Sequence, residues 1–224
     1  MDKYYPIMLD VKKKRCKVIG GGRVAERKVA TLLEYGALIT VISPKITDKL
    51  TEYFNHGKIE LIDRDYSYGD LDNSYLVYAA TDDEVSNKAC IKECKEKGIL
   101  LNVVDKPEMC DFIVPATIKR GHLNISISTN GKSPMLSRRI RQSLEKIFVD
   151  EYEEYLDVLG EIRSTVKKEV KDIKIRREIF MQLVYSDIFD RYLAGEKLDL
   201  KEELFKIYTL HINRLQGDEL NGEK

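Results

Sequence analysis

One stretch of the chain decides its fold: residues 16–42 read CKVIGGGRVAERKVATLLEYGALITVI. The stretch opens with a short apolar run that ends in glycines, which predicts a buried strand followed by a tight turn. Apolar residues then recur at helical spacing from Val24 to Tyr35-Gly36, where a glycine is typical of a helix end. The β-branched run at 38–42 predicts a second buried strand. The order is therefore strand, helix, strand.

The same alternation continues toward the C-terminus. Parallel strands need crossover connections, and helices between the strands supply them. We therefore expect residues 1–113 to form an α/β domain, with a doubly wound parallel sheet covered by helices on both faces. The apolar patterns predict further helices over 47–54 and 84–97 and further strands over 58–62, 75–80 and 100–104.

The pattern changes after Pro115. Residues 122–128 alternate between apolar and polar, which is typical of a half-exposed strand. Ser133-Pro134 offers a helix N-cap followed by proline at the first helical position, so a helix is predicted from there to about residue 148. Residues 114–148 are therefore expected to form a small α+β segment.

The rest of the chain, residues 149–224, is helical in pattern and rich in Glu and Lys. Glycines predict breaks in this pattern near Gly160 and Gly195. We expect a helical C-terminal domain.

The chain is neutral only by cancellation. It holds 38 Lys and Arg against 38 Asp and Glu, which excludes a generally basic nucleic-acid-binding protein. Residues 119–146 hold seven basic side chains and one acidic, a net charge of +6. Residues 147–224 hold 13 basic and 18 acidic, a net charge of −5, which leaves −1 for residues 1–118.

The sequence also predicts the compartment and the state of the thiols. No run of about 18 apolar residues occurs and the N-terminus lacks the pattern of a signal peptide, so we expect a cytoplasmic protein with no membrane partner. Cys90 and Cys94, four apart on a predicted helix, are interpreted as packed thiols rather than a metal or redox pair. The three histidines lie far apart in the sequence, so no metal site is predicted.

The glycines Gly20, Gly21 and Gly22 lie between the first strand and the first helix, followed by Arg23-Val24-Ala25. In this context Gly20 permits a tight turn, Gly22 lets the backbone approach a pyrophosphate, and Ala25 allows close packing of helix on strand. The helix start offers free N–H groups and a positive dipole end. The pattern predicts a Rossmann-like dinucleotide site, with a glycine turn without ligand as the alternative.

The acidic residue that usually binds the ribose about 20 residues further on is missing. Its place holds Ser43, Pro44 and Lys45. A serine can hydrogen-bond a ribose hydroxyl, whereas Lys45 or Arg23 could accept the 2′-phosphate of NADP. The residues alone leave NAD against NADP open.

Ligands of such sheets bind beyond the carboxyl ends of the strands, so the residues just after each strand are candidates for chemistry. Thr81 follows one predicted strand and Asp105 follows another. Asp105 could act as a general base, and an aspartate that organises a turn before Pro107 is the alternative. Further along, Arg138, Arg139 and Arg141 behind the Ser133 helix start suggest an anion site, although a solvated helix face is the usual explanation.

These motifs together resemble the siroheme synthase amino-terminal family. The resemblance covers residues 3–148 closely and the helical tail in character. It rests on six motifs in the same order: Tyr5-Pro-Ile7, Gly20-Gly-Gly-Arg-Val-Ala-Glu-Arg-Lys28, Ala79-Ala-Thr-Asp-Asp83, Asn102-Val-Val-Asp105, Asp111-Phe-Ile-Val-Pro115 and Ile127-Ser-Thr-Asn-Gly-Lys-Ser-Pro134.

The resemblance implies an NAD-dependent precorrin-2 dehydrogenase that forms sirohydrochlorin, and in some members a ferrochelatase that inserts Fe²⁺. It implies Asp105 as the catalytic aspartate and NAD as the cofactor. It also implies a homodimer in which residues 114–148 exchange strands and helix with the partner. By the same resemblance the cofactor contacts include Gly22, Arg23, Val24, Ser43, Pro44 and Lys45. The glycine turn and the end of the predicted strand at 75–80 add Gly20 and Thr81 to them. From the positive segment and the helix start at Ser133 we expect the substrate contacts to be Lys132, Ser133, Arg138 and Arg141.

Precorrin-2 carries eight carboxylates, so the positive segment at 119–146 suits it as a substrate. A rival hypothesis is a non-catalytic NAD-sensing regulatory module, which shares the glycine pattern. It predicts NAD binding without turnover and leaves Asp105 and the positive segment without a role.

Overall fold

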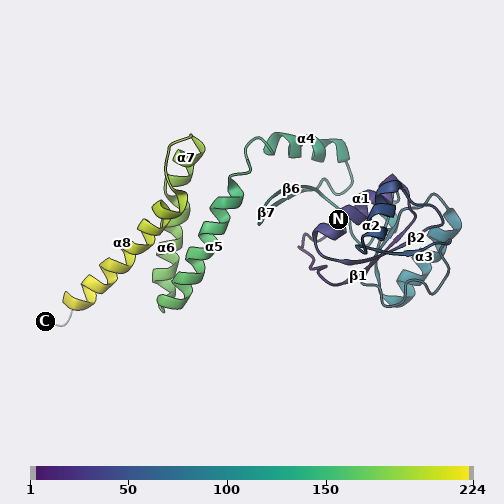
Figure 1. The fold of residues 1–224 in the computed structure, drawn as a ribbon, viewed down its shortest axis with the longest axis horizontal. Coiled ribbons are helices and arrows are strands. Elements are labelled where there is room, and N and C mark those ends of the chain that lie inside the picture. Colours follow the sequence, from purple (N-terminus) through teal and green to yellow (C-terminus); the bar gives the residue numbers. More distant parts are fainter. Residues whose placement is uncertain (1–3, 222–224) are drawn as a thin grey trace. The chain divides into compact units, whose positions relative to one another are not determined.

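The computed structural model describes residues 4–221, with side chains as far as residue 213. The chain divides into two compact units. Unit 1 comprises residues 1–114 with 130–132, and unit 2 comprises 115–129 with 133–224. Figure 1 follows the elements of both units along the chain.

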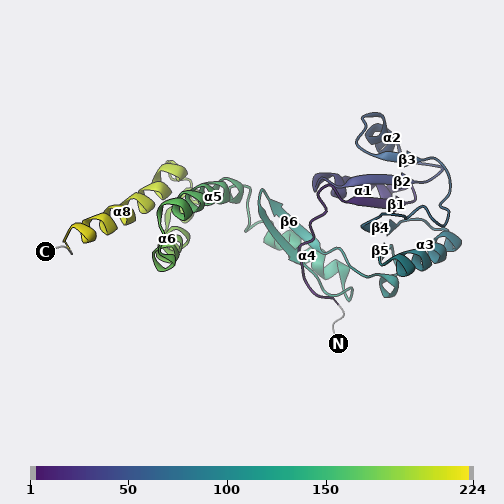
Figure 2. The same ribbon diagram turned by 90° about the horizontal axis from the view of Figure 1, so that it is seen from below.

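Unit 1 is built on a parallel five-stranded sheet in the order β3-β2-β1-β4-β5. Figure 2 shows the strands in this order from top to bottom. The central strands read as apolar runs because both of their faces are covered, and all four residues of β4 are buried. The strands are β1 (Arg15–Ile19), β2 (Leu38–Ile42), β3 (Glu60–Ile62), β4 (Leu76–Ala79) and β5 (Leu100–Val103).

Helices cover the two faces of this sheet through separate cores. On one face, α1 (Arg23–Glu34) contributes Ala25, Val29 and Leu32, and α2 (Asp48–Asn55) contributes Leu50. On the other face, α3 (Glu84–Lys97) contributes the thiols of Cys90 and Cys94. All four cysteines are buried and none of them forms a disulfide, so the packed-thiol interpretation of Cys90 and Cys94 agrees with the structure.

The start of unit 2 is a two-stranded antiparallel sheet of β6 (Ala116–Arg120) and β7 (Leu123–Ile127), followed by α4 (Pro134–Leu144). The sequence pattern predicts β7 but not β6, in which only Ile118 is fully buried and the apolar positions, Ala116 and Ile118, are too few to define a strand. The helix α4 also ends four residues earlier than predicted.

The helical part of unit 2 consists of α5 (Tyr152–Glu169), α6 (Ile173–Tyr185), α7 (Ile188–Leu193) and α8 (Leu200–Asn221). These helices share one core that includes Ile162, Ile179 and Leu204. The break predicted near Gly160 is wrong: Gly160 lies inside α5, where a long apolar face with Val158, Ile162 and Val166 outweighs the weak helix propensity of one glycine. The break near Gly195 is confirmed, with φ +83° at that glycine.

The predicted architecture is confirmed: a doubly wound parallel sheet, a small α+β segment and a helical C-terminal region. Element boundaries in unit 1 agree with prediction to within two residues. Within the part of the chain that the structure describes, no helix is long and apolar enough to cross a membrane.

Candidate active site

The carboxyl ends of the central strands of unit 1 form the candidate site. Strand order reverses between β1 and β4, and ligands of doubly wound sheets bind at this switch point. The ladder continues one residue beyond each strand. The Gly20 N–H donates to the Ile42 carbonyl (2.9 Å), the Ala80 N–H to the Ile19 carbonyl (2.8 Å) and the Val104 N–H to the Ala79 carbonyl (3.0 Å). The segments after β1, β4 and β5 therefore lie in a row.

Steric limits explain two of the three glycines after β1. Gly20 has φ +102°, and a Cβ there would lie 2.3 Å from the Ala80 carbonyl oxygen. A Cβ on Gly21 would lie 2.0 Å from the Lys45 carbonyl oxygen. These glycines let the turn pack against the segments after β4 and β2. The sequence pattern assigns Gly21 no role, because its backbone neighbour Lys45 is 24 residues away in the sequence.

Gly22 differs from both. A Cβ there would meet nothing within 4 Å, and no side chain caps the helix α1 that Gly22 begins. Arg23 is exposed and Val24 is half-buried in the first turn. The helix start therefore leaves open space beside N–H groups and a positive dipole end, which fits a pyrophosphate.

The turn after β2 holds Ser43 in a local role. Its side chain is buried, and its hydroxyl donates to the Lys45 carbonyl (2.7 Å). Because the hydroxyl proton is used in the turn, Ser43 can offer a ribose only an acceptor lone pair. Pro44 and the Lys45 side chain are exposed.

The loop after β4 is held by a residue that sequence analysis missed. The Asn87 side-chain N–H donates to the Thr81 carbonyl (2.9 Å), and the Thr81 hydroxyl accepts the Asp83 N–H (3.2 Å). Asn87 is buried, and its Oδ1 has no hydrogen-bond partner among the described residues. Asn87 lies on α3 and contacts the loop 6 residues before it. A single asparagine at this spacing forms no recognisable sequence pattern.

Asp105 follows β5 in a left-handed conformation, with φ +60°. A non-glycine residue seldom adopts this region, and such strain marks candidates for function. The Asp105 carboxylate is exposed and makes no hydrogen bond to any residue that the structure describes. A turn-organising aspartate would accept a backbone N–H close by, so this geometry favours a carboxylate available for chemistry.

The predicted substrate contacts follow one another along the chain, from Lys132 just before α4 to Arg141 in its last turn. The Ser133 hydroxyl caps α4 by accepting the Leu136 N–H (3.3 Å), and Arg141 forms an ion pair with Glu145. Lys132 and Arg138 are exposed, and neither forms an ion pair within residues 4–213. Lys132 belongs to unit 1, whereas Ser133, Arg138 and Arg141 belong to unit 2.

Comparison with known proteins agrees with this geometry. A family model described as NAD(P)-binding matches residues 7–116, and a model for the central part of sirohaem biosynthesis proteins matches residues 120–147. The siroheme synthase of Nitrosococcus oceani is 36% identical over 87% of this chain and 42% of its own length. That of Thioalkalivibrio sulfidiphilus is 34% identical over 91% of this chain and 42% of its own. The chain thus spans less than half the length of these relatives.

The fold is also similar to a solved structure of SirC, a precorrin-2 dehydrogenase. The two are 28% identical, with a TM-score of 0.77 over 92% of this chain and 100% of the other. Both units of the present chain therefore have a counterpart of known structure. The nicotinamide-binding sheet, the sirohaem-type central segment and the similarity over nearly the whole chain lead to one conclusion: the chain belongs to the siroheme synthase amino-terminal family.

Proposed function

We propose that this chain is an NAD-dependent precorrin-2 dehydrogenase that produces sirohydrochlorin in siroheme biosynthesis. The observation that carries the proposal is the free carboxylate of Asp105, held in a left-handed backbone conformation one strand away from the segment after β4. The family relationship suggests the reaction, and the geometry supports Asp105 as its base.

The nicotinamide dinucleotide is assigned to the carboxyl ends of β1, β2 and β4. Backbone N–H groups at the start of α1 would bind the pyrophosphate, and the open space at Gly22 is where it would approach. The turn after β2 would bind the adenosine ribose. The residues assigned are Gly20, Gly22, Arg23, Val24, Ser43, Pro44, Lys45 and Thr81.

NAD rather than NADP is the finer part of this assignment, and it rests on the family resemblance. Lys45 and Arg23 are both exposed and could also bind a 2′-phosphate. Comparing kcat/KM for the two dinucleotides tests the choice. A clear preference for NADP would overturn it and leave the dehydrogenase assignment standing.

The reaction removes one hydride and one proton from precorrin-2. A nicotinamide dinucleotide held at the start of α1 would supply the acceptor for the hydride. The Asp105 carboxylate accepts the proton and passes it to water, so that precorrin-2 and NAD⁺ give sirohydrochlorin, NADH and H⁺. An exposed base with no competing hydrogen bond can reach a substrate without first breaking an internal contact.

The substrate carboxylates are assigned to Lys132, Ser133, Arg138 and Arg141. The segment 119–146 carries a net charge of +6, which attracts an octacarboxylate. With this assignment, residues 1–113 bind NAD, 114–148 bind substrate and dimerise, and 149–224 form a helical domain.

Incubation of the purified protein with precorrin-2 and NAD⁺ tests the proposal directly. We expect one NADH for each sirohydrochlorin formed, and the absorbance of both products measures this ratio. Tight NAD binding without turnover would instead favour a regulatory nucleotide-sensing module. Chelation is a separate activity, and adding Fe²⁺ to sirohydrochlorin with and without the protein measures it.

A homodimer is part of the proposal. The small sheet of β6 and β7 has only two strands, which is marginal for independent stability. On the adjoining helix α4, Met135 is 73% exposed and Leu136 46% exposed. A second copy that covers these apolar side chains would stabilise both the sheet and the helix.

A further inference from the structure

A groove on the helical bundle of unit 2 combines positive charge with apolar surface. It lies between α5 and α6 and has a volume of about 560 Å³. Its cations are Arg163 and Lys167 on α5 and Arg176 and Arg177 on α6, and no acidic side chain lines it. Its apolar side chains are Ile173, Phe180, Met181, Val184 and Tyr185.

The four cations lack anionic partners. None of them forms an ion pair with any side chain between residues 4 and 213, although most other helices of unit 2 carry such pairs. The Arg176 side chain donates one N–H to the Lys171 carbonyl (3.1 Å), while its buried Nε finds no acceptor among the described residues. A buried N–H without an acceptor costs free energy, so a rotamer change that brings the Arg176 guanidinium to a carboxylate in the groove is favoured.

The apolar side chains of the groove are unusually exposed for a helical bundle. Ile173 is 74% exposed, Val184 55% and Tyr185 82%. Arg163 lies over the Phe180 ring at 5.0 Å, so the groove offers both an aromatic face and a positive charge at one place. Such a surface fits a ligand that is flat and apolar in the middle and anionic at its rim.

We propose that the α5–α6 groove is a second binding site for a polycarboxylate tetrapyrrole, in addition to the candidate active site of unit 1. The choice of ligand rests on the proposed function, because the substrate and product of that reaction are flat macrocycles with carboxylates around the edge. The groove is open, and its volume of about 560 Å³ can seat one face of a flat small molecule, with the four cations beside the carboxylates at the edge of that molecule.

The test uses the whole chain and uroporphyrin, a stable octacarboxylate porphyrin, as the probe. Fluorescence titration counts the sites per chain for the wild type and for the double variant Lys167→Glu/Arg177→Glu. Both side chains are exposed, so the variant leaves Arg176 and the Arg163–Phe180 contact in place. The matched control is Lys168→Glu/Lys174→Glu, which makes the same charge change on the same two helices outside the groove.

We expect the groove variant to bind one porphyrin fewer than the wild type, or to bind it about tenfold more weakly, which is about 1.4 kcal/mol. The control should match the wild type. Identical isotherms for all three proteins would overturn the proposal. The proposal would also be overturned if the wild type and the control bound phosphatidylserine vesicles and the groove variant did not. That result would assign the groove to a lipid surface.

The measurement involves neither NAD nor turnover. A failed dehydrogenase assay with an intact groove signal would therefore contradict the proposed function alone. Normal turnover by the wild type together with no groove signal would contradict this inference alone.

Discussion

The three glycines in the turn after β1 are not required for the same physical reason. Gly20 and Gly21 face backbone oxygens at distances that no Cβ tolerates, whereas Gly22 faces open space. The sequence pattern predicted the turn and the roles of Gly20 and Gly22. It could not predict the role of Gly21, because that role depends on where Lys45 lies in the folded chain.

This difference predicts that alanine at Gly20 mainly lowers stability, whereas alanine at Gly22 mainly weakens NAD binding. Gly20→Ala should lower the free energy of unfolding by more than about 2 kcal/mol, since it combines a positive φ with a clash against Ala80. Gly22→Ala should cost at most about 1 kcal/mol in stability. If the pyrophosphate approaches Gly22, this variant should nevertheless weaken NAD binding about tenfold or more.

Urea denaturation and NAD titration of both variants check the expectation. If the Gly22→Ala variant is stable and binds NAD as tightly as the wild type does, the pyrophosphate does not approach Gly22.

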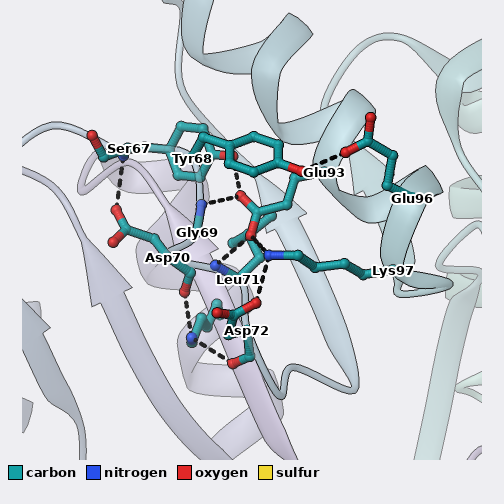
Figure 3. A network of polar contacts seen from close by, with 11 residues as sticks. Ser67, Tyr68, Gly69, Asp70, Leu71, Asp72, Glu93, Glu96 and Lys97 are labelled. Carbon is teal, nitrogen blue, oxygen red and sulfur yellow. Dashed lines mark hydrogen bonds and ion pairs between the residues drawn. The ribbon is translucent and has the colours of Figure 1, made fainter.

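At the scale of elements, one buried carboxylate holds a loop that no helix organises. Residues 63–75 connect β3 to β4, and Glu93 of α3 fixes them (Figure 3). The Glu93 carboxylate accepts the N–H groups of Gly69 (2.9 Å) and Leu71 (3.1 Å) and the Tyr66 hydroxyl (2.5 Å). Lys97 completes the network by donating to Glu93 and Asp72, both at 2.5 Å. The network connects this crossover to α3.

The protonation of Glu93 makes the network sensitive to acid. Burial raises the pKa of the carboxyl, but the hydrogen bonds from Lys97, Tyr66 and the two backbone N–H groups outweigh it, so the pKa lies below its usual value. A carboxyl with a lowered pKa in the folded state contributes stability above its unfolded pKa. That contribution is lost as the pH falls through the folded pKa.

Glu93→Gln should therefore destabilise unit 1 by about 2 kcal/mol at pH 7, because three donors and a lysine lose a charged acceptor. The difference from the wild type should shrink on acidification below about pH 4. Glu84→Gln is the control: this exposed carboxylate of the same helix pairs with Lys88 and Lys106 outside the network, and its change should alter stability by less than about 0.5 kcal/mol. Urea denaturation between pH 7 and pH 3 measures both, and a pH-independent difference would contradict the account.

Elements were predictable where one periodic pattern covered them. The alternation of strands and helices in unit 1 determined the sheet, because fully covered parallel strands must be apolar. The strand β6 and the unbroken helix α5 were missed for local reasons: Ile118 alone marks the strand as buried, and the glycine inside α5 is overruled by packing. The contacts of Glu93 with the loop join residues 22 to 27 positions apart, which no local pattern reveals.

At the scale of the whole molecule, zero net charge conceals a positive middle segment of +6. If this segment attracts a polyanionic substrate, KM for precorrin-2 should rise steeply with salt. Arg138→Ala should raise KM roughly three- to tenfold, and Arg141→Ala less, because Glu145 already neutralises part of the Arg141 charge. Steady-state kinetics at low and high salt check this. Unchanged KM values would remove these arginines from substrate binding without affecting the nucleotide site.

Assembly is the second prediction at this scale. We expect sedimentation to show a dimer, and Met135→Glu to weaken it by placing a charge within the apolar surface of α4. Gln142→Glu, an exposed change on the same helix, should leave the dimer intact. A monomeric wild-type protein, or a dimer indifferent to Met135→Glu, would contradict the proposed interface.

The most direct test of the central claim is the turnover of Asp105→Asn. Asparagine tolerates the left-handed conformation at this position, so the variant removes the base while keeping the backbone, which alanine would strain. We predict that kcat for precorrin-2 oxidation falls at least about 100-fold while NAD binding is unchanged. Asp63→Asn, an exposed aspartate after the edge strand β3, should retain wild-type turnover. An Asp105→Asn enzyme with wild-type kcat would show that Asp105 is not the base.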